Sequence, residues 1–208
     1  MRTRRYNPVA MALIDWTGLD STFRLDGGTV RLRPPKAGDY AEWAAVRAAS
    51  RDFLQPWEPV WARDDLTRSA YRRRLDAWRR DLEQGLTYPF FVFSNDTGAL
   101  TGGITLSNVR RGVAQVGTVG YWSSVHTTRQ GHTLAAVRTV TRFAFGTLGL
   151  SRLEAACLPS NTGSAALLLK AGFVEEGFAR AYLKINGEWR DHRLFGLISR
   201  EREQSCPD

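Results

Sequence analysis

A predicted β-hairpin near the C-terminus, residues 182–192, constrains the fold more than any other segment of this 208-residue chain. Two strand-like runs are joined there by Asn186 and Gly187, and an Asn-Gly pair favours a tight hairpin turn because both residues tolerate positive φ. The second run carries a cluster that is too polar and too aromatic for strand packing alone to select: Trp189, Arg190, Asp191 and His192. The segment therefore predicts a hairpin that also contributes to function.

Apolar periodicity and turn residues predict the remaining elements. They are a hairpin over 23–33, helices over 37–49 and 64–86, strands over 88–94, 99–106 and 116–123, a helix over 130–148, a strand over 153–158, a short helix over 164–171 and a final hairpin over 173–198. This order predicts a mixed α/β (α+β) fold in which helices flank one sheet. We expect an N-terminal extension over 1–22, a single domain over 23–200 and a C-terminal tail over 201–208.

Two local expectations concern the segment between the first two helices. Pro56 and Pro59 predict a rigid loop over 54–59, because proline removes a backbone donor and fixes φ. Asp64 or Asp65 is expected to cap the long helix that follows.

Composition limits the classes of protein to which the chain can belong. The net charge is +8 and nearly all basic residues are Arg, which reflects either the codon usage of the source genome or attraction of a polyanion. Charge alone does not predict nucleic-acid binding. No apolar run is long enough for a membrane span, and Asp15 and Trp16 replace the small residues of a signal-peptide cleavage site, so a cytoplasmic location is expected. Cys157 and Cys206 form no disulfide framework or metal-binding spacing, and no metal is expected.

A polar loop follows the strand predicted over 116–123, with Gly131 at the start of the next helix. Free N–H groups at a helix N-terminus point toward a bound anion, and the helix dipole adds a favourable potential. Such a loop fits a phosphate site, but it also fits an ordinary structural turn of an α/β fold.

Three separated segments resemble the GNAT superfamily of acetyltransferases, and within it the ribosomal-protein-alanine N-acetyltransferases. They are residues 54–59, residues 152–161 continued by Ser164, Leu168, Gly172 and Phe173, and residues 182–192. The resemblance covers about residues 29–198. It implies a largely antiparallel mixed sheet with a V-shaped splay between two parallel strands, at 116–123 and 153–158. It also implies acetyl-CoA as cofactor and a protein N-terminal α-amino group as acceptor, possibly of a ribosomal protein, with the enzyme a monomer or homodimer.

The resemblance also implies cofactor-binding residues. The family's pyrophosphate loop, Gln/Arg-x-x-Gly-x-Gly/Ala, matches residues 128–133, where only Gly131 fits the pattern. Thr128 and Thr133 depart from it, and Arg129 can partly offset the loss as a charged phosphate ligand. The expected cofactor-binding set is Val119, Tyr121, Arg129, Gln130, Gly131, His132, Thr133 and Asn161.

Three residues are candidates for catalysis, each with a structural alternative. Ser164 matches the position that protonates or hydrogen-bonds the leaving thiolate, or is simply a first-turn helix residue. Asn161 orients cofactor or substrate, caps the short helix, or does both. Glu154 is a candidate base if its side chain faces the splay, and otherwise points to solvent. No Cys–His arrangement predicts an acyl-enzyme, so direct transfer in a ternary complex is expected.

The acceptor side is expected to include Trp57, Glu58, Tyr182, Trp189, Asp191 and His192. Glu58 either receives the acceptor's ammonium or is a surface loop carboxylate, and Asp191 and His192 fit a structural hydrogen-bond cluster equally well. An acidic patch around Glu58 or Glu154 is expected, because the chain as a whole is basic. Two alternative functions remain: acetylation of a small-molecule amine, and a catalytically degenerate module that senses CoA or binds a partner.

Overall fold

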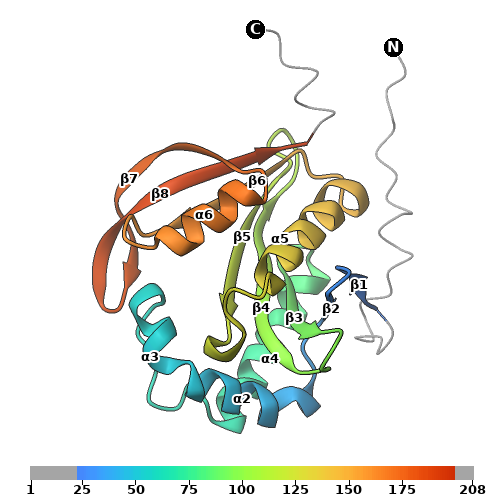
Figure 1. Ribbon diagram of the computed structural model, residues 1–208. Coiled ribbons are helices and arrows are strands. Elements are labelled where there is room, and N and C mark those ends of the chain that lie inside the picture. The colour runs from blue at the N-terminus through green and yellow to red at the C-terminus, as the bar shows by residue number, and fades with distance from the viewer. Residues whose placement is uncertain (1–22, 200–208) are drawn as a thin grey trace, which may run out of the picture.

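The computed structural model describes residues 23–199, which form one eight-stranded mixed sheet flanked by helices (Figure 1). The strand order is β1-β2-β3-β4-β5-β6-β8-β7, and among these described strands β5–β6 is the one parallel pair. The strands are β1 (Leu25–Asp26), β2 (Val30–Arg33), β3 (Tyr88–Ser94), β4 (Leu100–Arg110), β5 (Val116–Ser123), β6 (Arg152–Cys157), β7 (Val174–Ile185) and β8 (Glu188–Ile198). The predicted mixed, largely antiparallel sheet is confirmed, whereas the predicted extension and tail, with Cys206, lie outside the described residues.

Helices cover both faces of the sheet. On one face lie α5 (His132–Arg142), which continues as a π-helical turn over Phe143–Thr147, and α6 (Thr162–Lys170). On the other lie α2 (Tyr40–Ala49), the short α3 (Arg51–Leu54) and α4 (Arg68–Glu83). All of β3 is buried because it has a helical layer on each side. Phe90 packs in the core under α5, whereas its neighbour Phe91 packs with Trp43 and Tyr71 under α2 and α4.

The two parallel strands separate after a short paired stretch. Register between β5 and β6 covers only Val116–Arg152, Gly117–Leu153 and Thr118–Glu154. Beyond it, β5 stays paired with β4, and β6 stays paired with β8 as far as Cys157. Because each strand follows its own outer neighbour, the two diverge and form the predicted V-shaped splay.

Helix boundaries correct two local expectations. Thr67, not Asp64 or Asp65, caps α4, since its hydroxyl accepts a hydrogen bond from the Ala70 N–H. The two aspartates instead pair with arginines one turn or more into the helix, Arg73 and Arg74. The segment expected to be a loop, residues 54–59, begins with helical turns, because Pro56 occupies the first turn of a 3₁₀ helix (Gln55–Trp57), where a backbone donor is not needed.

The terminal hairpin forms as predicted, with an irregularity that the sequence did not indicate. Asn186 and Gly187 both have positive φ, as the tight turn requires. Between Ala179 and Leu183 the register with β8 shifts, and Ala181 takes a φ of 45°. The Asp191 carboxylate accepts a hydrogen bond from the Ala181 N–H at 2.8 Å and so holds this bulge.

Across residues 23–199 no helix is both long and apolar enough to cross a bilayer. Within the same range no group of three or more His, Cys, Asp or Glu side chains is arranged to hold a metal ion.

Candidate active site

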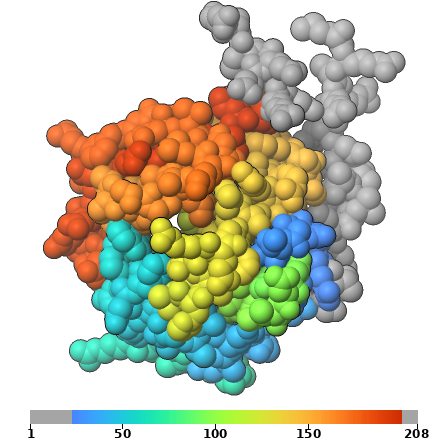
Figure 2. Space-filling view, in the orientation of Figure 1, coloured from blue at the N-terminus to red at the C-terminus, as the bar shows by residue number. Residues whose placement is uncertain are grey.

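A cavity of about 880 Å³ occupies the splay between β5 and β6. Both strands line it, together with the N-termini of α5 and α6, the segment 53–58 and parts of the β7–β8 hairpin. It opens to the surface between α6, α3 and the segment that precedes α5, coloured orange, cyan and yellow (Figure 2). Among the described residues, the main chain of β5 beyond Thr118 has no strand partner on the β6 side. Its backbone groups there are free to bind a ligand.

The cavity crosses the sheet and has two chemically different walls. Successive strand side chains point to opposite faces. Tyr121 of β5 contacts Ser164 of α6, whereas the next residue, Trp122, contacts Arg47 of α2. One wall therefore belongs to the α5/α6 face and the other to the α2/α3 face.

A pair of hydroxyl groups forms the centre of the α5/α6 wall. The Tyr121 and Ser164 oxygens are 2.8 Å apart, and either can be the donor. Burial raises the pKa of Tyr121 to about 12, partly opposed by the hydrogen bond with Ser164, so the phenol keeps its proton at neutral pH. Asn161 caps α6 by accepting a hydrogen bond from the Ser164 N–H at 3.0 Å. The predicted capping role of Asn161 is confirmed, and the Tyr121–Ser164 contact was not visible in the sequence.

Cys157 also lines this wall and is buried. Burial is the main cause that raises the pKa of its thiol, with a smaller opposing effect from Ser164. The protonated thiol is a poor nucleophile, which agrees with the expected direct transfer.

The loop predicted to bind the pyrophosphate has left-handed backbone at two positions before α5. Gly131 caps α5 with a φ of 81°, and Arg129 is also left-handed. Together with His132 and Thr133 they line the cavity, whereas Gln130 does not, because its side-chain amide turns back to the His126 carbonyl. The loop therefore presents the α5 N-terminus to the cavity.

Several features of the cavity fit the implied cofactor. A Cβ atom placed on Gly120 or Gly131 would meet nothing within 4 Å, so the backbone there faces open space. His132 is buried, and its Nδ1 has no hydrogen-bond partner within the described chain. A buried polar atom without a partner is costly unless a ligand or water satisfies it. A phosphate-bearing ligand at the α5 N-terminus would occupy the open space beside Gly131 and give His132 Nδ1 a partner.

Glu154 does not reach the cavity. It lies at the paired end of the splay, opposite Thr118, and its carboxylate accepts hydrogen bonds from Arg152 and Arg110. Glu154 was expected to act as a base only if its side chain faced the splay, and it does not.

Glu58 lines the α2/α3 wall but is already paired. Its carboxylate accepts two hydrogen bonds from Arg47 and one from the Trp61 indole. Arg47 is only 7% exposed, and its guanidinium lies 4.1 Å from the Trp61 ring centroid and 5.0 Å from that of Trp122. The expected acidic patch is therefore not formed by Glu58 or Glu154, since arginines neutralise both. Sequence inspection missed Arg47 and Trp61 because α2 and the loop meet only in three dimensions.

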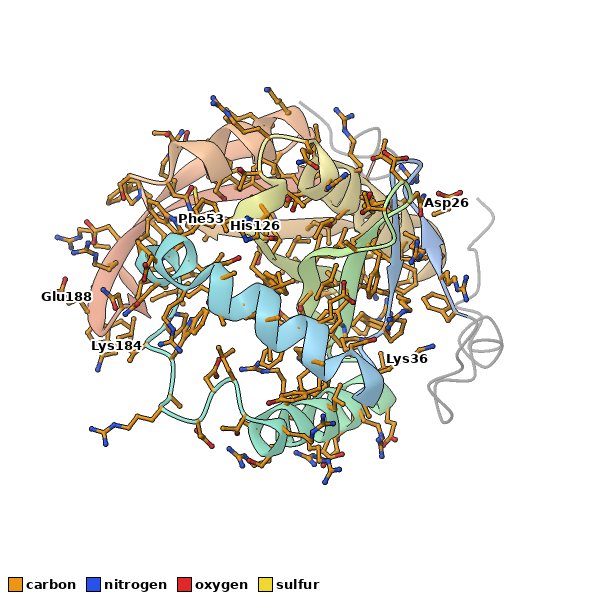
Figure 3. All side chains as sticks on the ribbon, turned by 60° about the horizontal axis from the view of Figure 1, so that its bottom comes forward. Asp26, Lys36, Phe53, His126, Lys184 and Glu188 are labelled. Carbon is orange, nitrogen blue, oxygen red and sulfur yellow. The ribbon has the colours of Figure 1, made fainter. Side chains whose placement is uncertain are left out.

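The β7–β8 hairpin closes this wall. The Asn186 N–H donates to the Glu58 carbonyl at 2.9 Å and ties the hairpin turn to the loop. Figure 3 shows Lys184 and Glu188 at the hairpin tip, on the side of the molecule where Phe53 of α3 lies. Phe53 and Trp57 line the cavity here.

The four predicted hairpin residues occupy different positions. His192 is buried and lines the cavity. Tyr182 packs its ring against His192 with centroids 5.6 Å apart, and Asp191 holds the bulge. Trp189 is 64% exposed and does not line the cavity. The structure thus brings His192, with the Tyr182 ring packed against it, to the cavity and leaves Trp189 outside it.

Solved structures share this architecture. Mycobacterium smegmatis RimJ in complex with CoA-disulfide superposes with a TM-score of 0.79 at 32% identity, covering 86% of each chain. Ribosomal-protein-S5-alanine acetyltransferase from Vibrio fischeri gives the same TM-score at 30% identity, covering 86% of this chain and 98% of that one.

Sequence relatives agree with the structural ones. The probable N-acetyltransferase YjcK of Bacillus subtilis is 34% identical over 86% of this chain and 99% of its own length. The [ribosomal protein uS5]-alanine N-acetyltransferase of Escherichia coli is also 34% identical, over 73% of this chain and 78% of its own. Residues 29–174 match the family described as the acetyltransferase (GNAT) domain. With its splayed strands, its glycine-capped α5 and these relatives, the chain belongs to the GNAT family of acetyl-CoA-dependent N-acetyltransferases.

Proposed function

We propose that this GNAT acetyltransferase acetylates the α-amino group of a protein N-terminus, with N-terminal alanine of a ribosomal protein as the preferred acceptor. The observation that carries the proposal is the two-walled cavity, which is lined both by the hydroxyl pair and by the aromatic side chains of Phe53 and Trp57. Relatives named for alanine acetylation of ribosomal proteins uS5 and S5 support the choice of acceptor.

The α5/α6 wall holds the acyl donor. The N-terminus of α5, Arg129 and Thr133 would bind the pyrophosphate, and His132 Nδ1 would gain a partner there. Unpaired backbone groups of β5 around Val119 would bind the pantetheine arm as an added strand does. An N–H in the same stretch would stabilise the negative charge that develops on the carbonyl oxygen.

Tyr121 and Ser164 act on the leaving group. Bound acetyl-CoA supplies a thioester, and a thiol has a pKa of about 8.5, so the departing thiolate needs hydrogen bonds. The pKa of Tyr121, about 12, is higher than that of the thiol. The hydroxyl pair therefore stabilises the thiolate by hydrogen bonding and keeps its own protons.

The α2/α3 wall receives the amine. Trp57 and Phe53 form an apolar surface, and Glu58, fixed by Arg47 and Trp61, orients the loop that carries it. An α-amino group has a pKa of about 7.7–8.0, so only a modest base is needed to obtain the neutral nucleophile at neutral pH.

Acetyl transfer to matched peptides tests the proposal. Peptides that begin with Ala or Ser, and an N-terminally blocked peptide that contains an internal Lys, are incubated with enzyme and acetyl-CoA and analysed by mass spectrometry. We expect modification at the α-amino group, fastest for Ala. Faster turnover of a polyamine or another small amine than of every peptide would replace this proposal with the small-amine alternative. Failure to bind acetyl-CoA in calorimetry would indicate a catalytically degenerate module that binds a partner instead.

A further inference from the structure

His192 lies on the side of the splay opposite the leaving-group hydroxyls. On β8, Arg193 pairs with Cys157, whose side chain belongs to the α5/α6 wall. Neighbouring strand residues face opposite sides of a sheet, so the His192 side chain belongs to the other, acceptor wall. It is only 3% exposed and lines the cavity.

A hydrogen bond to the backbone fixes the tautomer of the neutral His192 imidazole. His192 Nδ1 lies 3.0 Å from the Arg190 carbonyl oxygen. A carbonyl oxygen can only accept, so Nδ1 carries the proton and Nε2 of the neutral imidazole holds a free lone pair. The Tyr182 ring packs edge-on against the imidazole, and the bulge held by Asp191 places Tyr182 there. The orientation of His192 is therefore set by two contacts, the Arg190 carbonyl and the Tyr182 ring.

Within residues 23–199, the other titratable groups that line the cavity do not offer a base on this wall. Glu58 already accepts three hydrogen bonds. The pKa values of Tyr121 and Cys157 are both raised and these groups remain protonated on the opposite wall. His132, Arg129 and Lys170 also line the cavity, from the α5 N-terminus and from α6. Glu154 is outside it.

We propose that His192 is the general base of the reaction, an inference that rests on the proposed α-amino acetylation. Nε2 takes one proton from the acceptor ammonium and later gives it to solvent. The freed nitrogen lone pair forms the new C–N bond to the thioester carbonyl carbon, and the C–S bond breaks with its electron pair on sulfur. The second proton released from nitrogen goes to the thiolate, so the ammonium loses two protons, one to CoA and one to solvent.

Paired histidine variants test the role by kinetics. His192→Asn keeps a donor near the Nδ1 position, and His192→Gln keeps a polar group near Nε2, but neither has a base. We expect kcat at pH 7 to fall about 100-fold in both, within the usual range for loss of general base catalysis. The rising limb of kcat against pH should move up toward the pKa of the free α-amine, about 8, so that the deficit shrinks at pH 9. His126→Asn is the matched control, because His126 is exposed and does not line the cavity.

The pH profile separates a base from a structural role. Unchanged kcat in both variants, or an equal loss at every pH, overturns the assignment. Calorimetric affinity for acetyl-CoA should stay unchanged, since His192 lies on the acceptor wall. A wild-type enzyme that acetylates no peptide amine rejects the proposed function and the base role together, whereas an active wild type with pH-independent defects rejects the base role alone.

A measurement on the unaltered protein covers the case in which both variants fail to fold. The chain has three histidines, which ¹⁵N chemical shifts can distinguish by assignment. In the neutral form, His192 should show a protonated Nδ1 and an unprotonated Nε2. A proton on Nε2 of neutral His192 would leave no lone pair toward the amine and would overturn the proposal.

Discussion

The phenol oxygen of Tyr121 lies 2.8 Å from the hydroxyl of Ser164, although the two residues are 43 positions apart in the chain. The contact joins β5 to the first turn of α6 across the splay. We predict that Tyr121→Phe lowers kcat by about 10- to 100-fold, since one hydrogen bond to a developing charge is lost, with little change in KM for the peptide. Steady-state kinetics and calorimetry measure both quantities.

Tyr40→Phe is the control for that variant. The Tyr40 hydroxyl also donates a hydrogen bond within the protein, to the Leu66 carbonyl at 3.1 Å, but Tyr40 does not line the cavity. Each variant should lose about 1 kcal/mol of unfolding free energy. Equal kcat for the two would remove Tyr121 from the reaction.

The Arg47–Glu58 pair should matter for stability. Glu58→Gln leaves the buried guanidinium of Arg47 without its counter-ion and is expected to lower the unfolding free energy by about 3 kcal/mol. The exposed pair Arg73–Asp64, 63% and 52% exposed, provides the comparison, and Asp64→Asn should cost less than about 1 kcal/mol. Urea denaturation compares the two, and equal losses would contradict the buried-pair account.

Two glycines in neighbouring strands should respond in opposite ways to the same substitution. Gly120→Val places its side chain in the open cavity between β5 and β6. The melting temperature should stay unchanged while acetyl transfer is lost, because the added methyl groups occupy the cavity. Gly102→Val brings Cβ within 2.4 Å of the Trp122 carbonyl oxygen, so the protein should fold poorly. Thermal melts and activity assays on both variants test the pair. Full activity in Gly120→Val would show that the cavity between β5 and β6 is not the site of acetyl transfer.

Stability should decline at high pH because of buried tyrosine. The folded-state pKa of Tyr121 is raised from 10.0 to about 12, chiefly by burial. The folded state therefore holds this proton more tightly than the unfolded state. The resulting contribution of Tyr121 to the free energy of unfolding is fully present below pH 10 and is lost as the pH rises to about 12. Urea melts between pH 9 and 12 should show a steeper decline in the wild type than in Tyr121→Phe. If the unfolding free energies of the two proteins decline in parallel, Tyr121 is not the cause of the decline. Tyr71, whose pKa is also raised by burial, would then be the buried tyrosine responsible.

Features encoded by neighbouring residues were predictable from the sequence. The Asn186-Gly187 turn, the Asn161 cap and the Gly131 cap each depend on the conformation of one or two residues. The order of strands and helices followed from apolar periodicity, and the splay followed from family resemblance. These properties are local, so the identities of a few adjacent residues are sufficient to specify them.

The tertiary structure alone decided which side chains face the cavity. By residue type, Glu154 was the candidate base and His192 a candidate acceptor-side residue. Register places Glu154 at the paired end of the splay, between arginines, and His192 on the α2/α3 wall of the cavity. Arg47 neutralises Glu58 from a helix eleven residues earlier, and the bulge near Ala181 rotates Tyr182 onto His192. A strand side chain changes face with every residue, so pairing register and bulges, which depend on contacts between distant segments, determine its environment.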